Sequence, residues 1–162
     1  MKGISVSVIC VGKLKEKSYL AACAEYQKRL GAYCKLELTE LSEERLPQNP
    51  SRAQIDAALE KEAQAVKSKL PKGAAVVALC VEGKQLSSEE LAGWIEKQGV
   101  GGCGDLAFVI GSSHGLAPAV KQAAALRFSM GRITLPHQLA RLVLTEQLYR
   151  AFSINNHGKY HK

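Results

Sequence analysis

The residues best suited to chemistry gather in the last third of the chain. All four histidines lie between Leu106 and Lys162, and this stretch holds seven lysines and arginines but a single acid, Glu146. Such an excess of positive charge favours a polyanionic partner, and nucleic acid is the first candidate. The alternative is a solvated basic surface that binds no partner. The residues concerned are His114, His137, His157, His161, Lys121, Arg127, Arg132, Arg141, Arg150, Lys159 and Lys162.

The composition of the whole chain predicts a single globular domain over residues 1–162. The net charge is +7, and 46% of the residues are hydrophobic and 23% charged, which excludes disordered and collagen-like chains. The longest apolar runs, such as residues 74–81, fall far short of the roughly 18–20 residues of a membrane span. Residues 4–11 lead into Gly12 and Lys13 rather than a small-residue cleavage site, so they predict a strand and not a signal peptide. We therefore expect a cytoplasmic protein with no membrane partner.

The five cysteines form no recognisable site. They are odd in number and scattered, and no two have C-x-x-C spacing, so neither a disulfide framework nor a zinc site is expected. His157 and His161 could ligate a metal ion, but no carboxylate or thiolate lies beside them in the sequence. We predict that the protein binds no metal.

The common phosphate-binding loops are excluded. No Gly-x-Gly-x-x-Gly follows a predicted strand, and a P-loop around Gly12-Lys13 would need other residues at Ser7 and Leu14. Residues 110–116 are the remaining candidate, because Gly111 at a strand end permits a close backbone approach or a positive φ. A plain turn between a strand and a helix is the alternative for this loop.

The elements that must position these residues alternate between strands and helices. This alternation predicts an α/β fold with a mostly parallel sheet flanked by helices. In such a sheet, ligands bind outside the carboxyl ends of the strands, which directs attention to residues 79–83, 111–116 and 130–135. The predicted strands are 4–11, 35–41, 74–81, 106–110 and 127–130. The predicted helices are 18–30, one that begins at 51 and is ended by Pro71, one that begins at 87 and is followed by a turn at 99–104, 118–125 and 136–153. A further turn is predicted at 82–84.

The final helix and the tail carry the most specific pattern. The segments concerned, in their order along the chain, are VGKLK at 11–15, EY at 25–26, KRL at 28–30, EKE at 60–62, LSSE at 86–89, FVIG at 108–111, LPH at 135–137, EQLYRA at 146–151 and YH at 160–161. Together they closely resemble the ribosomal RNA large-subunit methyltransferase H (RlmH) family, small members of the SPOUT class of S-adenosylmethionine-dependent methyltransferases. The chain departs from many relatives at Ser112 and His114.

The resemblance implies a fold that periodicity alone does not predict. In the SPOUT class the C-terminal segment threads through a loop to make a trefoil knot, so a knotted cofactor-binding region is expected over about residues 74–155, followed by a polar tail at 154–162. The implied cofactor is S-adenosyl-L-methionine. The positions implied to bind it lie at the three strand ends already singled out: Leu79, Gly111, Met130, Gly131, Arg132, Ile133, Thr134 and Leu135.

The implied reaction is N3-methylation of a pseudouridine in large-subunit (23S) ribosomal RNA, on the assembled ribosome. A base must help to remove the N3 proton, and histidine is the natural type near neutral pH. His161 and Tyr160 are the predicted catalytic residues, with a disordered polar terminus as the alternative. His137, at a helix start, is predicted to shape the pocket wall.

Arginines and a terminal lysine are the predicted RNA contacts, namely Arg141, Arg150 and Lys162. Arg150 has a simpler alternative, a helix-surface pair with Glu146. The resemblance further implies a homodimer packed across the final helix, with the tail of one subunit completing the site of the other. Two other functions stay open: a SPOUT methyltransferase acting on transfer RNA, and a non-catalytic basic RNA-binding module.

Overall fold

A computed structural model describes residues 3–162, in which strands and helices alternate as the sequence predicts. The α/β fold class is confirmed, and each expected element is present. The elements are β1 (Ser5–Val11), α1 (Lys17–Leu30), β2 (Lys35–Leu41), α2 (Arg52–Lys69), β3 (Ala75–Gln85), α3 (Ser88–Val100), β4 (Asp105–Ile110), α4 (Pro118–Ala123), β5 (Leu126–Ser129) and α5 (His137–Asn155).

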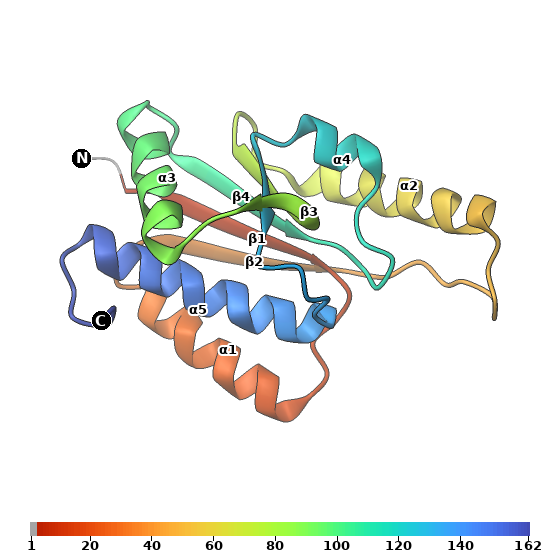
Figure 1. Ribbon diagram of the computed structural model, residues 1–162, viewed down its shortest axis with the longest axis horizontal. Helices are drawn as coiled ribbons and strands as arrows, with labels where there is room; N and C mark the ends of the chain where they lie inside the picture. Colours follow the sequence, from red (N-terminus) through yellow and green to blue (C-terminus); the bar gives the residue numbers. More distant parts are fainter. Residues whose placement is uncertain (1–2) are drawn as a thin grey trace.

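The five strands form one sheet in the order β2-β1-β4-β3-β5, and every neighbouring pair is parallel. All five carboxyl ends therefore lie at one edge of the sheet. Helices α1, α3 and α5 cover one face, and α2 and α4 cover the other (Figure 1). This arrangement places both the loop after β4 and the segment after β5 at the edge where ligands bind in parallel sheets.

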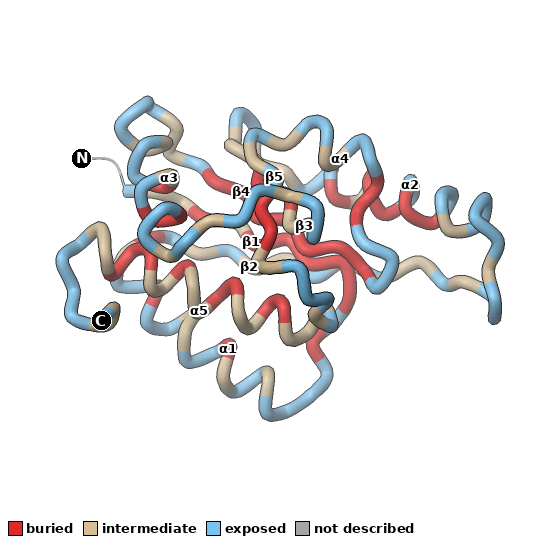
Figure 2. The backbone as a smooth tube through the Cα atoms, in the orientation of Figure 1, coloured by how far each residue is buried: buried red, intermediate tan, exposed pale blue. Residues whose placement is uncertain are grey.

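The strand residues alternate between two cores, as the pleat of a strand requires. Val6, Val8 and Cys10 pack with α1, α3 and α5, whereas Ile9 and Val11 pack with α2. The central strands β1 and β4 are buried along most of their length (Figure 2). Their near-continuous apolar sequences follow from this double coverage.

The helix starts expected at residues 51 and 87 are confirmed, and each is closed by a capping box. The Ser51 hydroxyl accepts a hydrogen bond from the Gln54 backbone N–H, and the Gln54 side chain accepts one from the Ser51 N–H. Ser87 and Glu90 exchange the same pair of bonds at the start of α3. Each box satisfies two backbone donors that a helix end otherwise leaves unpaired.

Strand β3 is longer than predicted, and the turn expected at residues 82–84 is wrong. Both Leu79 and Lys84 pair with Phe128 of β5, so residues 80–83 bulge out of register between them. A Cβ added at Gly83 would lie 2.7 Å from the carbonyl carbon and oxygen of Arg127. Glycine at 83 therefore lets β3 return to β5 after the bulge, which no local sequence signal could reveal.

Smaller differences concern helix ends. Pro136 caps α5 instead of occupying its first turn, and α3 continues through Gly99 and Val100, which were expected in a turn. The helices of the described residues include none long and apolar enough to cross a membrane. The trefoil knot and its limits at residues 74–155 stay predictions.

Candidate functional site

A cavity of about 640 Å³ opens at the carboxyl edge of the sheet. Its wall comes from the bulge of β3, the loop after β4, and the segment that joins β5 to α5. Seven of the eight residues expected to bind the cofactor line it, and the exception is Arg132, whose side chain is exposed to solvent. The lining includes residues 79–82, 110–116, Lys121, Phe128, Met130, Gly131, 133–137 and Ala140.

Gly111 lies where two backbone segments meet. A Cβ there would overlap the carbonyl oxygen of Gly115 and would lie 2.5 Å from its carbonyl carbon. The turn that causes this approach is closed by a hydrogen bond of 2.8 Å from the Gly115 N–H to the Ser112 carbonyl, with Gly115 at φ +84°. Of the two reasons considered for glycine at 111, the close backbone approach is confirmed.

Two acids hold this turn from outside. The buried Glu62 carboxylate accepts one hydrogen bond from the Ser112 hydroxyl (2.8 Å) and another from the Glu44 backbone N–H (2.9 Å). Glu43 accepts a hydrogen bond of 2.7 Å from the Ser113 hydroxyl. Sequence reasoning assigned no role to Glu62. The available signal was a carboxylate on the face of α2 that also carries the buried Leu59, Ala63 and Val66.

We expect Glu62→Ala to lower the free energy of unfolding by about 1–3 kcal/mol, because a buried donor on Ser112 and a partly buried donor on Glu44 lose their acceptor. It should also weaken binding of the expected cofactor, since the turn at 112–115 forms part of the cavity wall. Chemical denaturation and calorimetry measure the two effects. The matched control is Glu60→Ala, an exposed acid on the same helix. Equal effects of the two variants would contradict a positioning role for Glu62.

The charged side chains at the cavity mouth include an ion pair. Lys121 Nζ lies 2.6 Å from Glu82 Oε1, and this hydrogen bond holds the pKa of Glu82 below its ordinary value. His114 also lines the cavity, with an exposed side chain. His137 lies in the wall at the start of α5, as predicted.

The loop between β1 and α1 is fastened to the first turn of α5. Gly12 has φ +120°, and a Cβ there would meet His137 Nε2 at 2.9 Å. The Gln138 side-chain carbonyl accepts hydrogen bonds from the backbone N–H groups of Lys15 (3.1 Å) and Glu16 (3.3 Å). Residues near the start of the chain therefore support a cavity formed mostly by its second half.

Arg141, predicted to contact RNA, is buried instead. Its side chain is 5% exposed, and its Nη1 lies 2.6 Å from Glu40 Oε2. Burial raises the pKa of Glu40, but hydrogen bonds from Arg141 and the Leu14 N–H outweigh it and hold this pKa below the ordinary value. The guanidinium is thus a structural link between β2 and α5, and its burial argues against the predicted contact with RNA.

Arg141→Ala should lower the free energy of unfolding by about 1–2 kcal/mol, because it removes the buried cation that pairs with Glu40, while solvent screens part of the loss at this 33% exposed carboxylate. Since the pKa of Glu40 is depressed in the folded protein, the stabilisation is present above the ordinary value of 4.5 and is lost as pH falls through the lower folded value. Urea denaturation at pH 7 and at pH 3 measures the loss of stability and its dependence on pH. The control is Arg45→Ala, an exposed arginine. A deficit as large at pH 3 as at pH 7 would contradict this account.

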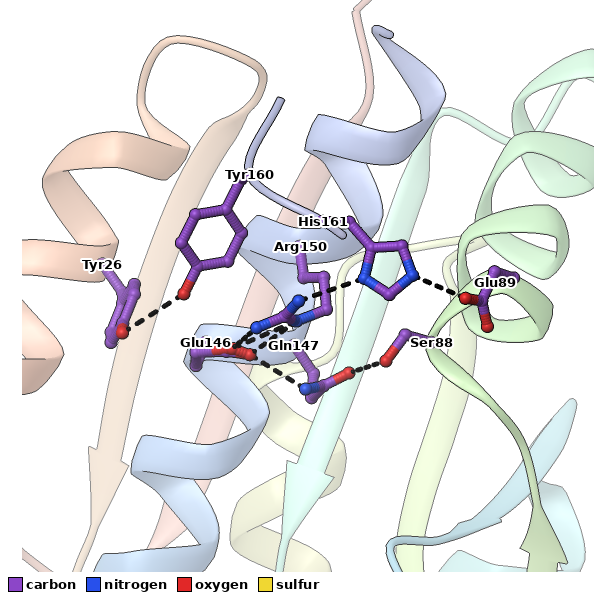
Figure 3. Close-up of polar contacts among 8 residues, drawn as sticks. All are labelled: Tyr26, Ser88, Glu89, Glu146, Gln147, Arg150, Tyr160 and His161. Atoms are coloured by element: carbon purple, nitrogen blue, oxygen red, sulfur yellow. Dashed lines mark hydrogen bonds and ion pairs between the residues drawn. The ribbon is translucent and has the colours of Figure 1, made fainter. Parts of the chain in front are cut away.

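The tail folds back onto α5 (Figure 3). The Tyr160 ring packs edge-on against Tyr149 at 4.7 Å between centroids, and the Arg150 guanidinium lies over it at 4.7 Å. The Tyr160 hydroxyl donates to the Tyr26 hydroxyl of α1 at 3.4 Å. Burial and this hydrogen bond raise the pKa of Tyr160 to about 12, so its phenol is protonated at neutral pH.

His161 lies between a cation and an anion (Figure 3). Its Nδ1 is 3.0 Å from Arg150 Nη1, and its Nε2 is 2.5 Å from Glu89 Oε1. A guanidinium can only donate, so Nδ1 accepts, and the proton lies on Nε2 and is donated to Glu89. The hydrogen bond from His161 lowers the pKa of Glu89.

Arg150 and Glu146 form a salt bridge, which confirms the simpler alternative for Arg150. Nε and Nη2 of Arg150 lie 3.0 and 3.2 Å from the two carboxylate oxygens of Glu146. Gln147 donates a further hydrogen bond to Glu146 and accepts one from Ser88 (Figure 3). Glu146 thus has the arginine partner that the sequence suggested. Lys162 is exposed, and its contact with RNA stays a prediction.

The tail and the cavity lie at opposite ends of α5. His137 lines the cavity, and Arg150 follows thirteen residues later, about 20 Å along the helix. Neither Tyr160 nor His161 lines the cavity of its own chain. Within one chain, the predicted catalytic residues and the cavity therefore lie apart.

The side chains that could ligate a metal are dispersed. Within residues 3–162, no three histidine, cysteine or acidic side chains are grouped so that they could hold a metal ion. The cysteines are free thiols, and burial raises the pKa of Cys10 to about 12 and that of Cys34 to about 11.

Known proteins share this architecture. Residues 4–161 match the family model described as "Predicted SPOUT methyltransferase". The chain is 49% identical over 159 residues to the ribosomal RNA large subunit methyltransferase H of Limosilactobacillus reuteri (strain DSM 20016), and 46% identical to that of Streptococcus uberis; each match covers 98% of this chain and 100% of the relative.

Two solved structures share the fold at low sequence identity. A probable methyltransferase from Bordetella pertussis Tohama I superposes with TM-score 0.54 at 17% identity, covering 93% of this chain and 96% of that one. A probable methylase family protein from Haemophilus influenzae Rd KW20 gives TM-score 0.53 at 16% identity, covering 100% and 72%. The chain therefore belongs to the SPOUT methyltransferase family and, within it, to the ribosomal RNA large subunit methyltransferase H group.

Proposed function

We propose that this chain transfers a methyl group from S-adenosylmethionine to N3 of a pseudouridine in large-subunit ribosomal RNA, on the assembled ribosome. The observation that carries the proposal is the cavity at the carboxyl edge of the sheet, formed by the three segments that the family resemblance assigns to the cofactor. Relatives that are 49% and 46% identical to the chain are named ribosomal RNA large subunit methyltransferases, and this supports a ribosomal RNA substrate.

The cavity suits the proposed cofactor in size and in chemistry. Its volume of about 640 Å³ lies within the range of small-molecule sites, roughly 300–1,000 Å³. Apolar side chains of Leu79, Leu116 and Leu135 offer walls for an adenine ring, and the loops offer backbone N–H and C=O groups for its polar edge. Gly111, Met130, Gly131, Ile133 and Thr134 complete the proposed contacts, and the cofactor would supply an already activated sulfonium methyl.

The protein must then orient N3 of the pseudouridine and take its proton. The proposed acceptor of the N3 proton is Nδ1 of His161, which becomes free to accept when Arg150 moves away. Glu89 would hold Nε2–H and stabilise the imidazolium that forms. Tyr160, protonated at neutral pH, would position the base or donate a hydrogen bond.

A homodimer would bring tail and cavity together. Leu139, Leu142 and Val143 of α5 are only partly buried, and Leu20 of α1 is 44% exposed. Such half-exposed apolar side chains on neighbouring helices favour packing against a second copy. In a two-fold dimer across α5, each tail would lie near the cavity of the other subunit.

Mass spectrometry of ribosomal RNA tests the reaction. A strain that lacks this protein should lose one methyl group from one pseudouridine of the large subunit, and purified protein with S-adenosylmethionine should restore it on ribosomes. Unchanged ribosomal RNA, with a methyl group lost from transfer RNA instead, would indicate the transfer-RNA methyltransferase. Failure to bind S-adenosylmethionine in calorimetry would indicate a non-catalytic RNA-binding module.

A further inference from the structure

The loop between β1 and α1 presents three lysines at alternating positions. Lys13, Lys15 and Lys17 are exposed, whereas Leu14 between them is buried. We propose that this lysine loop, residues 12–17, binds backbone phosphates of the RNA substrate beside the methyl-donor cavity. The inference rests on the proposed function, and it names a surface that replaces the buried Arg141 as an RNA contact.

The lysine loop is held in place by its own backbone. The Gly12 N–H donates to the Leu41 carbonyl at 2.7 Å, and the Leu14 N–H donates to Glu40 Oε2 at 3.1 Å. The Lys15 and Glu16 N–H groups share the side-chain oxygen of Gln138. A backbone fastened in this way loses little further freedom when a ligand binds, so the entropic cost of binding is confined to the lysine side chains.

The lysine loop adjoins the cavity wall. Gly12 packs against His137, which lines the cavity, and Gln138 is the next residue of α5. The loop runs beside the start of α5 in the ribbon view (Figure 1). In the proposed complex, an RNA strand whose target base enters the cavity passes its backbone along this rim, within reach of the lysine side chains.

The charges of the lysine loop are available to a ligand. No ion pair among the described residues includes Lys13, Lys15 or Lys17. Lys17 occupies the first turn of α1, where the helix dipole disfavours a cation, so its charge does not serve the stability of that helix. Unpaired cations on an ordered loop complement the regular negative charge of an RNA backbone.

The test replaces the three lysines together, as Lys13→Gln, Lys15→Gln and Lys17→Gln. Its matched control is Lys67→Gln, Lys69→Gln and Lys72→Gln, which removes the same charge from exposed residues preceding β3, at the opposite edge of the sheet. The probe is ribosomes from a strain lacking this protein. We expect the slope of log K against log salt concentration to become shallower by about 2 in the loop variant, at roughly 0.7 per lost phosphate contact.

Kinetics and cofactor binding complete the test. The KM for ribosomes should rise about tenfold or more in the loop variant, with kcat at saturating ribosomes and S-adenosylmethionine affinity unchanged. A loop variant that matches the wild type or the control variant in salt slope and KM overturns the inference. If the wild-type protein itself neither binds S-adenosylmethionine nor methylates ribosomes, the proposed function fails, which is a separate result.

Discussion

Gly111→Val should abolish measurable binding of S-adenosylmethionine. Even the first carbon of the new side chain would overlap the Gly115 carbonyl, so the turn at 112–115 must move, and the remaining methyl groups would enter the cavity or its wall. Because the buried strands do not depend on this turn, the protein should still fold, with a lowered Tm. Isothermal calorimetry with S-adenosylmethionine measures the loss, and circular dichroism measures the fold.

The control for this variant is Gly104→Ala, since a Cβ at that position meets nothing within 4 Å. It should bind the cofactor as the wild type does. Normal binding by Gly111→Val would show that the cofactor does not use the loop after β4. The assignment of the cavity would then be wrong.

Deletion of residues 160–162 should spare cofactor binding and lower the methylation rate by roughly 10²–10⁴-fold, the usual contribution of a general acid–base group. Binding survives because these residues do not line the cavity of their own chain. The rate falls because the imidazole of His161 is lost. Single-turnover methylation of ribosomes, with calorimetry in parallel, measures the two effects, and full activity of the truncated protein would remove the tail from the mechanism.

Mixing the two inactive proteins tests the shared site. A dimer of one Gly111→Val chain and one truncated chain contains one intact cavity facing one intact tail, provided that the tail acts on the other subunit. Random pairing should then restore about a quarter of wild-type activity, since half of the dimers are mixed and each has one working site. No recovery would mean that cavity and tail must belong to the same chain.

Much of the fold could be predicted because its signals are local. Apolar runs such as residues 4–11 and 106–110 define buried strands, and the capping boxes at Ser51 and Ser87 define helix starts. The bulge of β3 escaped prediction because it depends on Phe128 pairing with two residues of another strand. Such a pairing exists only in the folded sheet.

The parts of the site that depend on local backbone geometry were predictable from the sequence. The parts that depend on side chains distant in the sequence were not. Gly111 was identified because a glycine at the end of a buried strand indicates a tight backbone approach at that point. The burial of Arg141 was not predictable, because its partner, Glu40, lies 101 residues away in the sequence and a charge pattern does not report burial. Glu62 was missed for the same reason, since Ser112 lies 50 residues further on.

The separation of cavity and tail along α5 has a consequence for how activity depends on protein concentration. A rigid helix of this length keeps the cavity and the tail apart within one polypeptide, so under the proposed mechanism the functional unit would be the dimer. Specific activity should therefore be constant in concentrated solution and should decline on dilution, as the subunits part. Excess of a catalytically inert partner with an intact tail would restore turnover under those dilute conditions.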